Sequence, residues 1–135
     1  FGVSSQAHAA MLNKQVKYST LDKIAKAQLG KPYGWGATGP SSFDCSGLTS
    51  YIYKKGAGIT IPRVASAQYQ FGKKVSYKNL KKGDLVFFSQ GFGISHTGFY
   101  VGNGKMIDAQ NHMKYDPVLN GWETFVGGAR IANVN

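Results

Sequence analysis

The 135-residue chain contains only one cysteine, four prolines and six acidic residues, and it has no long hydrophobic run. A single cysteine excludes an internal disulfide and any metal site built from several cysteines. Because no apolar run approaches the roughly 18 residues that a membrane span requires, we expect no membrane-spanning segment. A chain of this length still buries enough surface for one domain that needs neither disulfides nor a metal for stability.

The scarcity of acidic residues leaves 16 lysines and arginines largely unbalanced, with a formal charge of +10. This excess favours acidic partners, among them nucleic acid, an anionic membrane and an anionic cell wall. The cations occur as separate pairs at 54–55, 73–74 and 81–82, with no run of five and no helix-turn-helix, zinc-finger or RNP signature. We therefore predict a generally basic surface and no nucleic-acid partner.

Glycine and aromatic residues are abundant, with 18 glycines, 13% aromatic and 42% hydrophobic residues. This composition is typical of a globular, loop-rich protein that contains a sheet. Residues 1–17 are small, polar and weakly patterned, so we predict a linker or N-terminal arm there and one folded domain over residues 18–135. The chain does not begin with methionine and shows no signal-peptide pattern at its start, which favours a mature or excised fragment.

Helical periodicity and helix-ending residues predict three helices, at about 20–29, 45–55 and 64–71. Capping-box patterns at 19–22 and 41–44 precede the first two. Alternating patterns predict strands at about 74–77, 85–89, 96–102, 105–110 and 128–133, and the stretch 59–61 is strand-like. Asn103 and Gly104 predict a two-residue hairpin turn.

The one cysteine, Cys45, lies where the second helix is predicted to begin. In a first helical turn the unpaired amides and the helix dipole favour anions, and this increases the thiolate population of a cysteine. A buried cysteine with only a packing role is the alternative. Position alone favours neither a nucleophile nor a packing residue.

A cysteine nucleophile needs a base, and a third group that orients the base. His96 and His112 follow Cys45 in the chain, and His96 opens a predicted strand after a glycine-rich segment. In a regular hairpin around 103–104, Asp108 would pair with Phe99 and face away from His96, whereas a bulge would reverse this. The hairpin pattern therefore leaves open which residue orients the histidine.

Two large aromatic residues, Tyr33 and Trp35, lie in a segment too rich in glycine and proline for regular structure. Packing into the core and a role in a site explain Trp35 equally well. For Tyr33, whose hydroxyl needs a partner when buried, a site role is favoured.

Five short blocks occur in a characteristic order: PYGWG at 32–36, FDCSGL at 43–48, PR at 62–63, GDLVFF at 83–88 and SHTGFYVG at 95–102. Together they resemble the NlpC/P60 family of cell-wall cysteine endopeptidases. The resemblance covers about residues 20–133. Short glycine-rich patterns recur by chance, but five in register make a specific signal.

The resemblance implies a papain-like α+β fold, in which the nucleophile-bearing helix packs on an antiparallel sheet of about five strands. It implies that Cys45 is the nucleophile and His96 the general base, and that the Tyr33 hydroxyl and the Cys45 amide stabilise the oxyanion. The family's third polar residue is commonly His, with Asn or Gln variants, and here that position is Asp108. A carboxylate also accepts a hydrogen bond from imidazole, so this departure is compatible with activity.

The resemblance also implies a substrate. Asp44 and Ser46 match residues that hold the amino end of a peptidoglycan stem peptide in relatives, and Arg63, Ser66 and Trp35 are further candidates for substrate binding. The expected protein is a monomeric thiol peptidase, secreted or wall-associated in a Gram-positive envelope. It would hydrolyse the stem peptide between D-γ-glutamyl (or iso-Gln) and the diamino acid, without metal or cofactor. The basic surface is compatible with anionic wall polymers as a second partner.

Three other classes of protein fit parts of this sequence. An inactive wall-binding module would lack part of the catalytic set, and the presence of Cys45, His96 and Tyr33 argues against it. A related-fold amidase or acyltransferase would act on lipid or other amides, whereas the polar Asp44 and Arg63 favour a peptide. A nucleic-acid binder would need a contiguous basic groove, which the sequence does not reveal.

Overall fold

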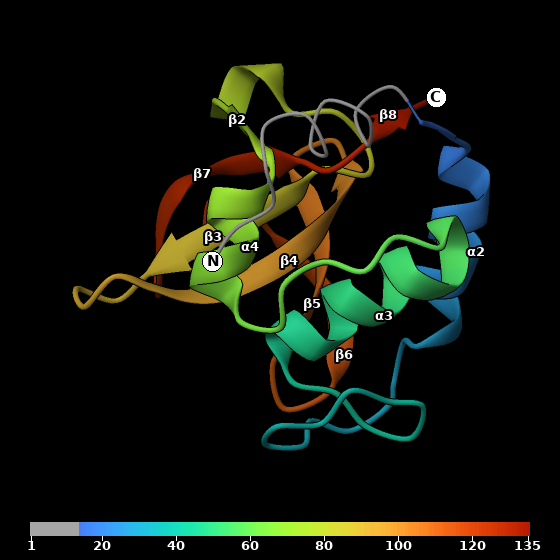
Figure 1. The fold of residues 1–135 in the computed structure, drawn as a ribbon. Coiled ribbons are helices and arrows are strands. Elements are labelled where there is room, and N and C mark those ends of the chain that lie inside the picture. Colours follow the sequence, from blue (N-terminus) through green and yellow to red (C-terminus); the bar gives the residue numbers. More distant parts are fainter. Residues whose placement is uncertain (1–13) are drawn as a thin grey trace.

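One helix, α3 (Cys45–Ala57), lies across an antiparallel sheet and organises the molecule (Figure 1). The computed structural model describes residues 14–135. The six strands of the sheet are arranged in the order β2-β7-β3-β4-β5-β6. Their bounds are β2 Lys73–Val75, β3 Leu85–Ser89, β4 Ile94–Gly102, β5 Lys105–Ala109, β6 Met113–Pro117 and β7 Thr124–Arg130. The fold is thus α+β, as the resemblance implies.

Two further helices flank α3. Helix α2 (Tyr18–Ala27) packs beside α3, and the short α4 (Ala65–Phe71) lies against the sheet near the other end of α3 (Figure 1). A 3-10 turn (Tyr77–Asn79) follows β2. Strands β1 (Gln15–Val16) and β8 (Asn133–Val134) form a separate parallel pair. This pair ties the beginning of the described chain to its end.

Helix α3 is delimited by its two end residues. Asp44 is the N-cap, and its carboxylate accepts a hydrogen bond from the Gly47 amide at 2.6 Å. At the other end Gly58 adopts a left-handed conformation with φ 67°, which glycine tolerates best. Lys54 and Lys55 in the last turn complement the helix dipole. The first residue of the helix is therefore Cys45.

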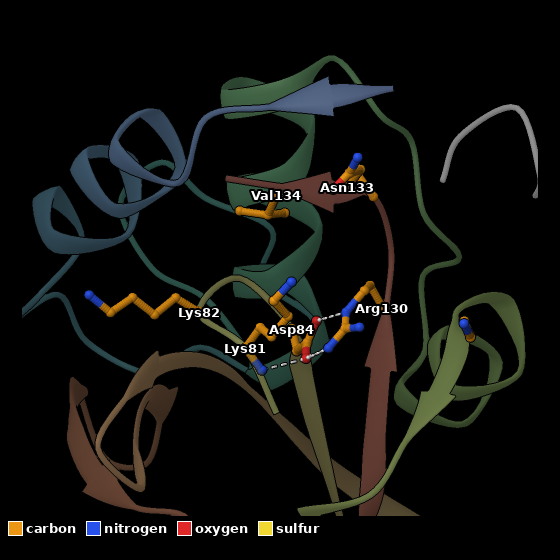
Figure 2. A pocket seen from close by; sticks show the side chains of 8 residues that line it. Lys81, Lys82, Asp84, Arg130, Asn133 and Val134 are labelled. Atoms are coloured by element: carbon orange, nitrogen blue, oxygen red, sulfur yellow. Dashed lines mark hydrogen bonds and ion pairs between the residues drawn. The ribbon is translucent and has the colours of Figure 1, made fainter. Parts of the chain in front are cut away.

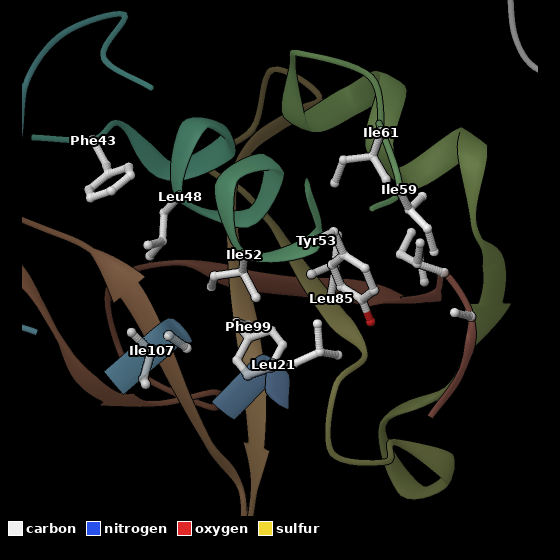
Figure 3. Packing of buried hydrophobic residues seen from close by; sticks show 14 of the residues in the cluster. Leu21, Phe43, Leu48, Ile52, Tyr53, Ile59, Ile61, Leu85, Phe99 and Ile107 are labelled. Atoms are coloured by element: carbon white, nitrogen blue, oxygen red, sulfur yellow. The ribbon is translucent and has the colours of Figure 1, made fainter. Parts of the chain in front are cut away.

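The core lies between α3 and the sheet. Leu48, Ile52 and Tyr53 of α3 face the side chains of the central strands, with Leu21 of α2 beside them (Figure 3). The facing strand residues are Leu85, Phe99 and Ile107. All of these side chains are fully buried. Burial stabilises each by about 1.5–3 kcal/mol relative to exposure, so this layer holds α3 rigidly on the sheet.

All three predicted helices are present, but both predicted capping boxes are wrong. Helix α2 begins at Tyr18 with no side-chain cap, and Asp22 instead accepts from the Tyr18 hydroxyl at 3.1 Å and pairs with Lys26 at 2.9 Å. Before α3, the capping residue is Asp44 itself rather than a serine three residues earlier. In both cases the carboxylate binds other partners than the one that the pattern assumes.

The five predicted strands are present, with ends that differ by a few residues. Strand β6 was not predicted, because it is an edge strand with two polar residues, a tyrosine and a proline in five positions. The stretch 59–61 is not a strand, although Ile59 and Ile61 are buried. Of the predicted N-terminal arm, residues 1–13 lie outside the described residues, and Val16 is buried in the core.

Within residues 14–135, no helix combines the length and the apolar character needed to cross a membrane.

Candidate active site

Cys45 is half-buried at the start of α3, where a glycine-rich loop closes over the helix end. The Asp44 amide donates to the Ala37 carbonyl at 2.9 Å, which ties the loop to the helix. A side chain at Gly47 would place its Cβ 2.1 Å from that same carbonyl oxygen, so this close approach requires glycine. The predicted position of Cys45 in the first turn is confirmed.

His96 and Asp108 face each other across β4 and β5. The register pairs Gly98 with Asp108, and it shifts between Tyr100 and Gly102. One extra residue in β4 therefore forms a bulge, so that Asp108 lies on the same face of the sheet as His96. The regular hairpin register considered from the sequence is wrong, and the bulge is the physical reason.

The histidine and the carboxylate are in direct contact. Asp108 Oδ2 lies 2.8 Å from His96 Nε2, and Asp108 is completely buried. Gly98 lies opposite Asp108, and a Cβ there would lie 2.7 Å from Met106 Sδ and 3.2 Å from the Asp108 Cβ. Gln110 Nε2 donates to the same carboxylate oxygen at 2.8 Å. The carboxylate is thereby fixed in the orientation that a base-orienting residue needs.

The ionisation of His96 follows from its neighbours. Burial by itself would lower the pKa of its imidazole, but hydrogen bonds to Asp108 and Cys45, and the negative charges of Cys45 and Glu123, together raise this pKa to about 10. With Nε2 held by Asp108, Nδ1 is the nitrogen left for Cys45. His96 therefore rests as an imidazolium next to Cys45 at neutral pH.

A titration of the His96 ring checks this description. In ¹⁵N-labelled wild-type protein we expect the imidazole to keep its second proton until about pH 10. In Cys45→Ala and in Asp108→Asn the ring should lose this proton at lower pH, because each variant removes a negative partner. Hydrolytic activity that needs imidazolium should fall as the pH rises through the same range. Titration near pH 6.5 in all three proteins, the ordinary histidine value, would contradict the ion pair.

The second proton of the His96 imidazole also contributes to the free energy of unfolding. The folded chain holds it up to about pH 10. An unfolded chain holds it only below roughly pH 6.5. The stabilising contribution is therefore complete below the lower value and is lost as pH rises through the higher one.

Beside Cys45, the structure brings together Asp44, Ser46 and Arg63. The Arg63 guanidinium reaches both Asp44 carboxylate oxygens, at 2.7 and 3.2 Å, and donates to Ser46 Oγ at 2.8 Å. Asp44 thus caps the helix and binds arginine at the same time. Three of the five predicted substrate-binding residues thus form one polar cluster next to Cys45.

Gln68 holds this cluster in place, and the sequence analysis assigned it no role. It is fully buried on α4, and its amide group donates to the backbone carbonyls of Ser46 at 3.1 Å and of Pro62 at 2.9 Å. Its oxygen accepts from the Thr49 hydroxyl at 2.7 Å. The segment that carries Arg63 is thereby fixed against α3. In the sequence, only the place of this glutamine on the apolar face of a short predicted helix could have indicated such a role.

The remaining predicted site residues differ in their surroundings. Tyr33 is 39% exposed, and its pKa is raised by burial and then by the negative charges of Cys45 and Asp44, which places its hydroxyl within their electrostatic reach. Trp35 is 92% exposed, so the core-packing alternative is wrong. Ser66 is exposed on α4 and makes no hydrogen bond to any other candidate among the described residues.

Glu123 is a further carboxylate near the site that sequence patterns did not indicate. Burial raises its pKa, the negative charge of Asp108 adds to this, and the positive His96 opposes it. Its Oε1 is buried without a hydrogen-bond partner in the described structure. His112, the alternative base, is exposed and contacts Asn111 at 2.8 Å instead.

A cysteine on the first turn of a helix, with a histidine and a carboxylate on the adjoining antiparallel sheet, defines a papain-like α+β protein with a cysteine–histidine site. Comparison with known families agrees, since the model of the NlpC/P60 family matches residues 30–130. The chain belongs to the NlpC/P60 family.

Its relatives include both enzymes and a binding protein. Over 109 residues it is 53% identical to the probable endopeptidase p60 of Listeria innocua, which covers 78% of this chain and 23% of that protein. The NlpC/p60 domain of the peptidoglycan hydrolase SagA matches with TM-score 0.75 and 31% identity, over 84% of this chain and 97% of that one. RipD of Mycobacterium tuberculosis, a non-catalytic NlpC/p60 domain protein adapted to peptidoglycan binding, matches with TM-score 0.75 and 28% identity, over 84% and 96%. The chain spans less than a quarter of the length of the Listeria relatives.

Proposed function

We propose that this domain is a peptidoglycan hydrolase, a cysteine endopeptidase that cleaves the stem peptide between D-γ-glutamyl (or iso-Gln) and the diamino acid. The observation that carries the proposal is the buried contact between His96 and Asp108 at 2.8 Å, directly beside a cysteine on a helix N-terminus. The endopeptidase and peptidoglycan hydrolase relatives support the same class of reaction.

The geometry supports a two-step acyl transfer. The Cys45 thiolate attacks the carbonyl carbon of the γ-amide, and the oxyanion that forms is stabilised by the Cys45 amide and the Tyr33 hydroxyl. His96 gives its proton to the leaving amine, and the thioester remains on Cys45. His96 then takes a proton from water, which attacks the thioester and releases the glutamyl product. Asp108 keeps the imidazole oriented and stabilises its charged form throughout.

The polar cluster supports recognition of a free amino terminus on the substrate. A carboxylate has about four acceptor positions. Asp44 Oδ1 already accepts from Gly47, Arg63 and Ser46, whereas Oδ2 accepts only from Arg63 and therefore has room for a bond from an ammonium group. Ser46 adds a neutral partner beside it. We infer that a stem peptide binds with its L-Ala terminus at this cluster and its γ-amide at Cys45.

Substitution of Asp44 tests this placement. Asn retains an oxygen that accepts from the Gly47 amide but has no charge, so in Asp44→Asn we expect KM for a synthetic L-Ala-D-iso-Gln-L-Lys peptide to rise roughly tenfold, the cost of losing one charge-assisted hydrogen bond. The N-acetylated peptide should show no such change. The matched control is Asp22→Asn on α2, far from the cluster. Equal changes in KM for both peptides would speak against binding of the amino terminus at Asp44.

An inactive wall-binding module is the alternative that a relative supports, since RipD is described as non-catalytic. This chain retains Cys45, His96, Asp108 and Tyr33 in one site, and this favours catalysis. Release of the L-Ala-D-iso-Gln dipeptide from the synthetic peptide by the wild type would support the endopeptidase. Binding without any release would favour the alternative.

The proposed substrate places the protein at the cell wall. We propose that it acts there as a secreted or wall-associated monomer in a Gram-positive envelope, with anionic wall polymers as a second partner. The charge of +10 supports attraction to such polymers.

A further inference from the structure

We propose that the surface at the far end of the sheet from His96 is a binding groove for a phosphodiester polymer. The groove consists of three adjoining cavities that all include Lys82, two of which also include Lys81. Figure 2 shows the first of them, where Lys81 lies beside the ion pair of Asp84 and Arg130 and the Lys82 side chain extends away from that pair. This proposal concerns binding and does not depend on which bond the enzyme cleaves.

The first cavity, of about 200 Å³, is lined by four cationic residues and one carboxylate. That carboxylate, Asp84, is 2% exposed and already neutralised. It receives bonds of 2.9 Å from Arg130 Nε and Nη2 and one of 2.8 Å from the Lys81 amide. The three lysines that line the cavity, Lys73, Lys81 and Lys82, form no ion pair with any carboxylate of residues 14–135.

The other two cavities extend the same positive surface. One of about 610 Å³ adds Lys17, and one of about 370 Å³ adds Lys26 and Lys105. Of these added lysines, only Lys26 has an acidic partner, Asp22 at 2.9 Å. Cations that are scattered in the sequence at 17, 73, 81, 82 and 105 are thus gathered by the fold, which the sequence pattern did not predict.

The distribution of the acidic residues makes this surface strongly positive. All six lie within residues 14–135. Four of them lie in the candidate active site or next to it: Asp44, Asp108, Asp116 and Glu123. The other two, Asp22 and Asp84, are paired with Lys26 and Arg130. No unpaired acidic side chain remains to neutralise the groove, so it attracts anions.

The groove and the catalytic site can be occupied together. His96 lies near the first residue of β4, and Gly102, which lines the groove, is the last residue of that strand. Six residues of extended chain span roughly 20 Å. A polymer held by the groove would therefore tether the enzyme to the wall while its cleft remained free for stem peptides.

The side chains of the groove favour a phosphodiester polymer without bases over single-stranded nucleic acid. Single-stranded nucleic acid binds through successive aromatic rings on which bases stack. Here the Tyr18 ring lies against Phe99 at 6.1 Å and beneath Lys82 Nζ at 5.4 Å, which leaves Tyr115 as the exposed aromatic side chain of the groove. Ammonium groups suffice for a polymer recognised by its phosphates alone.

Binding of synthetic poly(glycerol phosphate) tests the groove. We expect Lys81→Gln/Lys82→Gln to lower its affinity at least about tenfold and to flatten the dependence of log affinity on log salt, because two phosphate contacts are lost. The matched control is Lys54→Gln/Lys55→Gln, an exposed pair on α3 with the same change in net charge, which should lower affinity no more than twofold. Hydrolysis of the soluble stem peptide should be unchanged in both variants.

Two outcomes would overturn the groove proposal. One is equal loss of affinity in the two double variants, which would show attraction to net charge only. The other is tighter binding of a single-stranded oligonucleotide than of poly(glycerol phosphate) at equal phosphate concentration. Either result would leave the stem-peptide activity, and hence the proposed function, untouched.

We also infer, resting on the proposed function, that Asp116 is a positioning residue. Its carboxyl group shares a proton with that of Asp108. Strand pairing places Lys114 opposite Asp108 and Met106 opposite Asp116, so the two carboxyl groups are diagonal neighbours on one face of the sheet. Asp108 is fully buried and Asp116 is 6% exposed. Asp108 Oδ1 and Asp116 Oδ2 are both buried, and in the described structure neither has a hydrogen-bond partner.

A shared proton explains both unpartnered oxygens. Two adjoining buried carboxylates repel each other strongly unless one is protonated. The pKa of Asp116 is raised to about 6, first by burial and then by the hydrogen bond and charge of Asp108, while Lys114 at 3.4 Å opposes the shift. Burial alone would raise the pKa of Asp108, but the hydrogen bonds from His96, Asp116 and Gln110 outweigh burial and lower this pKa. Protonated Asp116 thus donates to Asp108, whose other oxygen remains free to accept from His96.

The pH profile of kcat on the soluble stem peptide separates this role from a structural one. As pH rises through about 6, Asp116 loses its proton and Asp108 loses a donor, so wild-type kcat should fall two- to fivefold. Asp116→Asn, whose amide donates at every pH, should keep at least half of the activity and lack this fall. Lys114→Met should move the fall to higher pH, because Lys114 stabilises the charged Asp116. Identical profiles for wild type and Asp116→Asn would overturn the inference.

Discussion

In Cys45→Ala, release of stem-peptide fragments from purified peptidoglycan should fall by at least about 10,000-fold, because removal of a catalytic nucleophile abolishes the covalent step. The chain has no second cysteine that could substitute. The fold should be retained, since Cys45 is only half-buried and the start of α3 is held by the Asp44 carboxylate and by the loop contact to Ala37.

The control for this variant uses the same single thiol. Alkylation of the wild type with one equivalent of iodoacetamide modifies Cys45 alone and should abolish activity to the same extent. A thermal unfolding midpoint close to that of the wild type would show that Cys45→Ala is folded. Undiminished release by the folded variant would reject the assignment of Cys45 as the nucleophile.

The second large effect is expected at His96. In His96→Ala we expect a loss of kcat of roughly 1,000-fold or more, because both the base and the leaving-group acid are removed. In Asp108→Ala the loss should be smaller, since the imidazole that acts as base and acid remains. Asp108 acts only through His96, by orienting the ring and favouring its charged form.

Steady-state kinetics of the two variants on the soluble stem peptide measure this difference. Asp108→Asn is the matched variant, because it preserves the size of the side chain and removes its charge. Equal losses in His96→Ala and Asp108→Ala would show that Asp108 is as essential as the base. Since both residues are buried, circular dichroism and the unfolding midpoint of each variant must accompany the kinetics.

The sequence predicted the surroundings of Cys45 at the start of α3 well, because local patterns determine them. The helix start at Cys45 follows from Asp44 and from the residues just after it, and Gly47 is needed where the loop meets the helix. The five motif blocks then placed Tyr33 and His96 in the same site. Short-range chemistry of this kind is readable in a single chain.

The surroundings of His96 were harder to predict, because they depend on how the strands pair. One bulged residue in β4 decides whether Asp108 faces His96, and no turn signal at 103–104 reveals it. Strand β6 lacked a recognisable pattern, so Asp116 behind Asp108 could not be anticipated. Likewise, the gathering of Lys17 and Lys105 beside Lys82 results from the tertiary fold. Long-range juxtaposition was the missing information in each case.

Mass spectrometry of purified Gram-positive peptidoglycan, digested in parallel with the wild type and with Cys45→Ala, tests the central claim most directly. We predict that the wild type alone releases fragments that end in D-γ-glutamyl or D-iso-Gln and leaves new amino termini on the diamino acid. Fragments cut at another bond would contradict the proposed specificity. Identical fragments from both proteins would contradict the claim that Cys45 performs the cleavage.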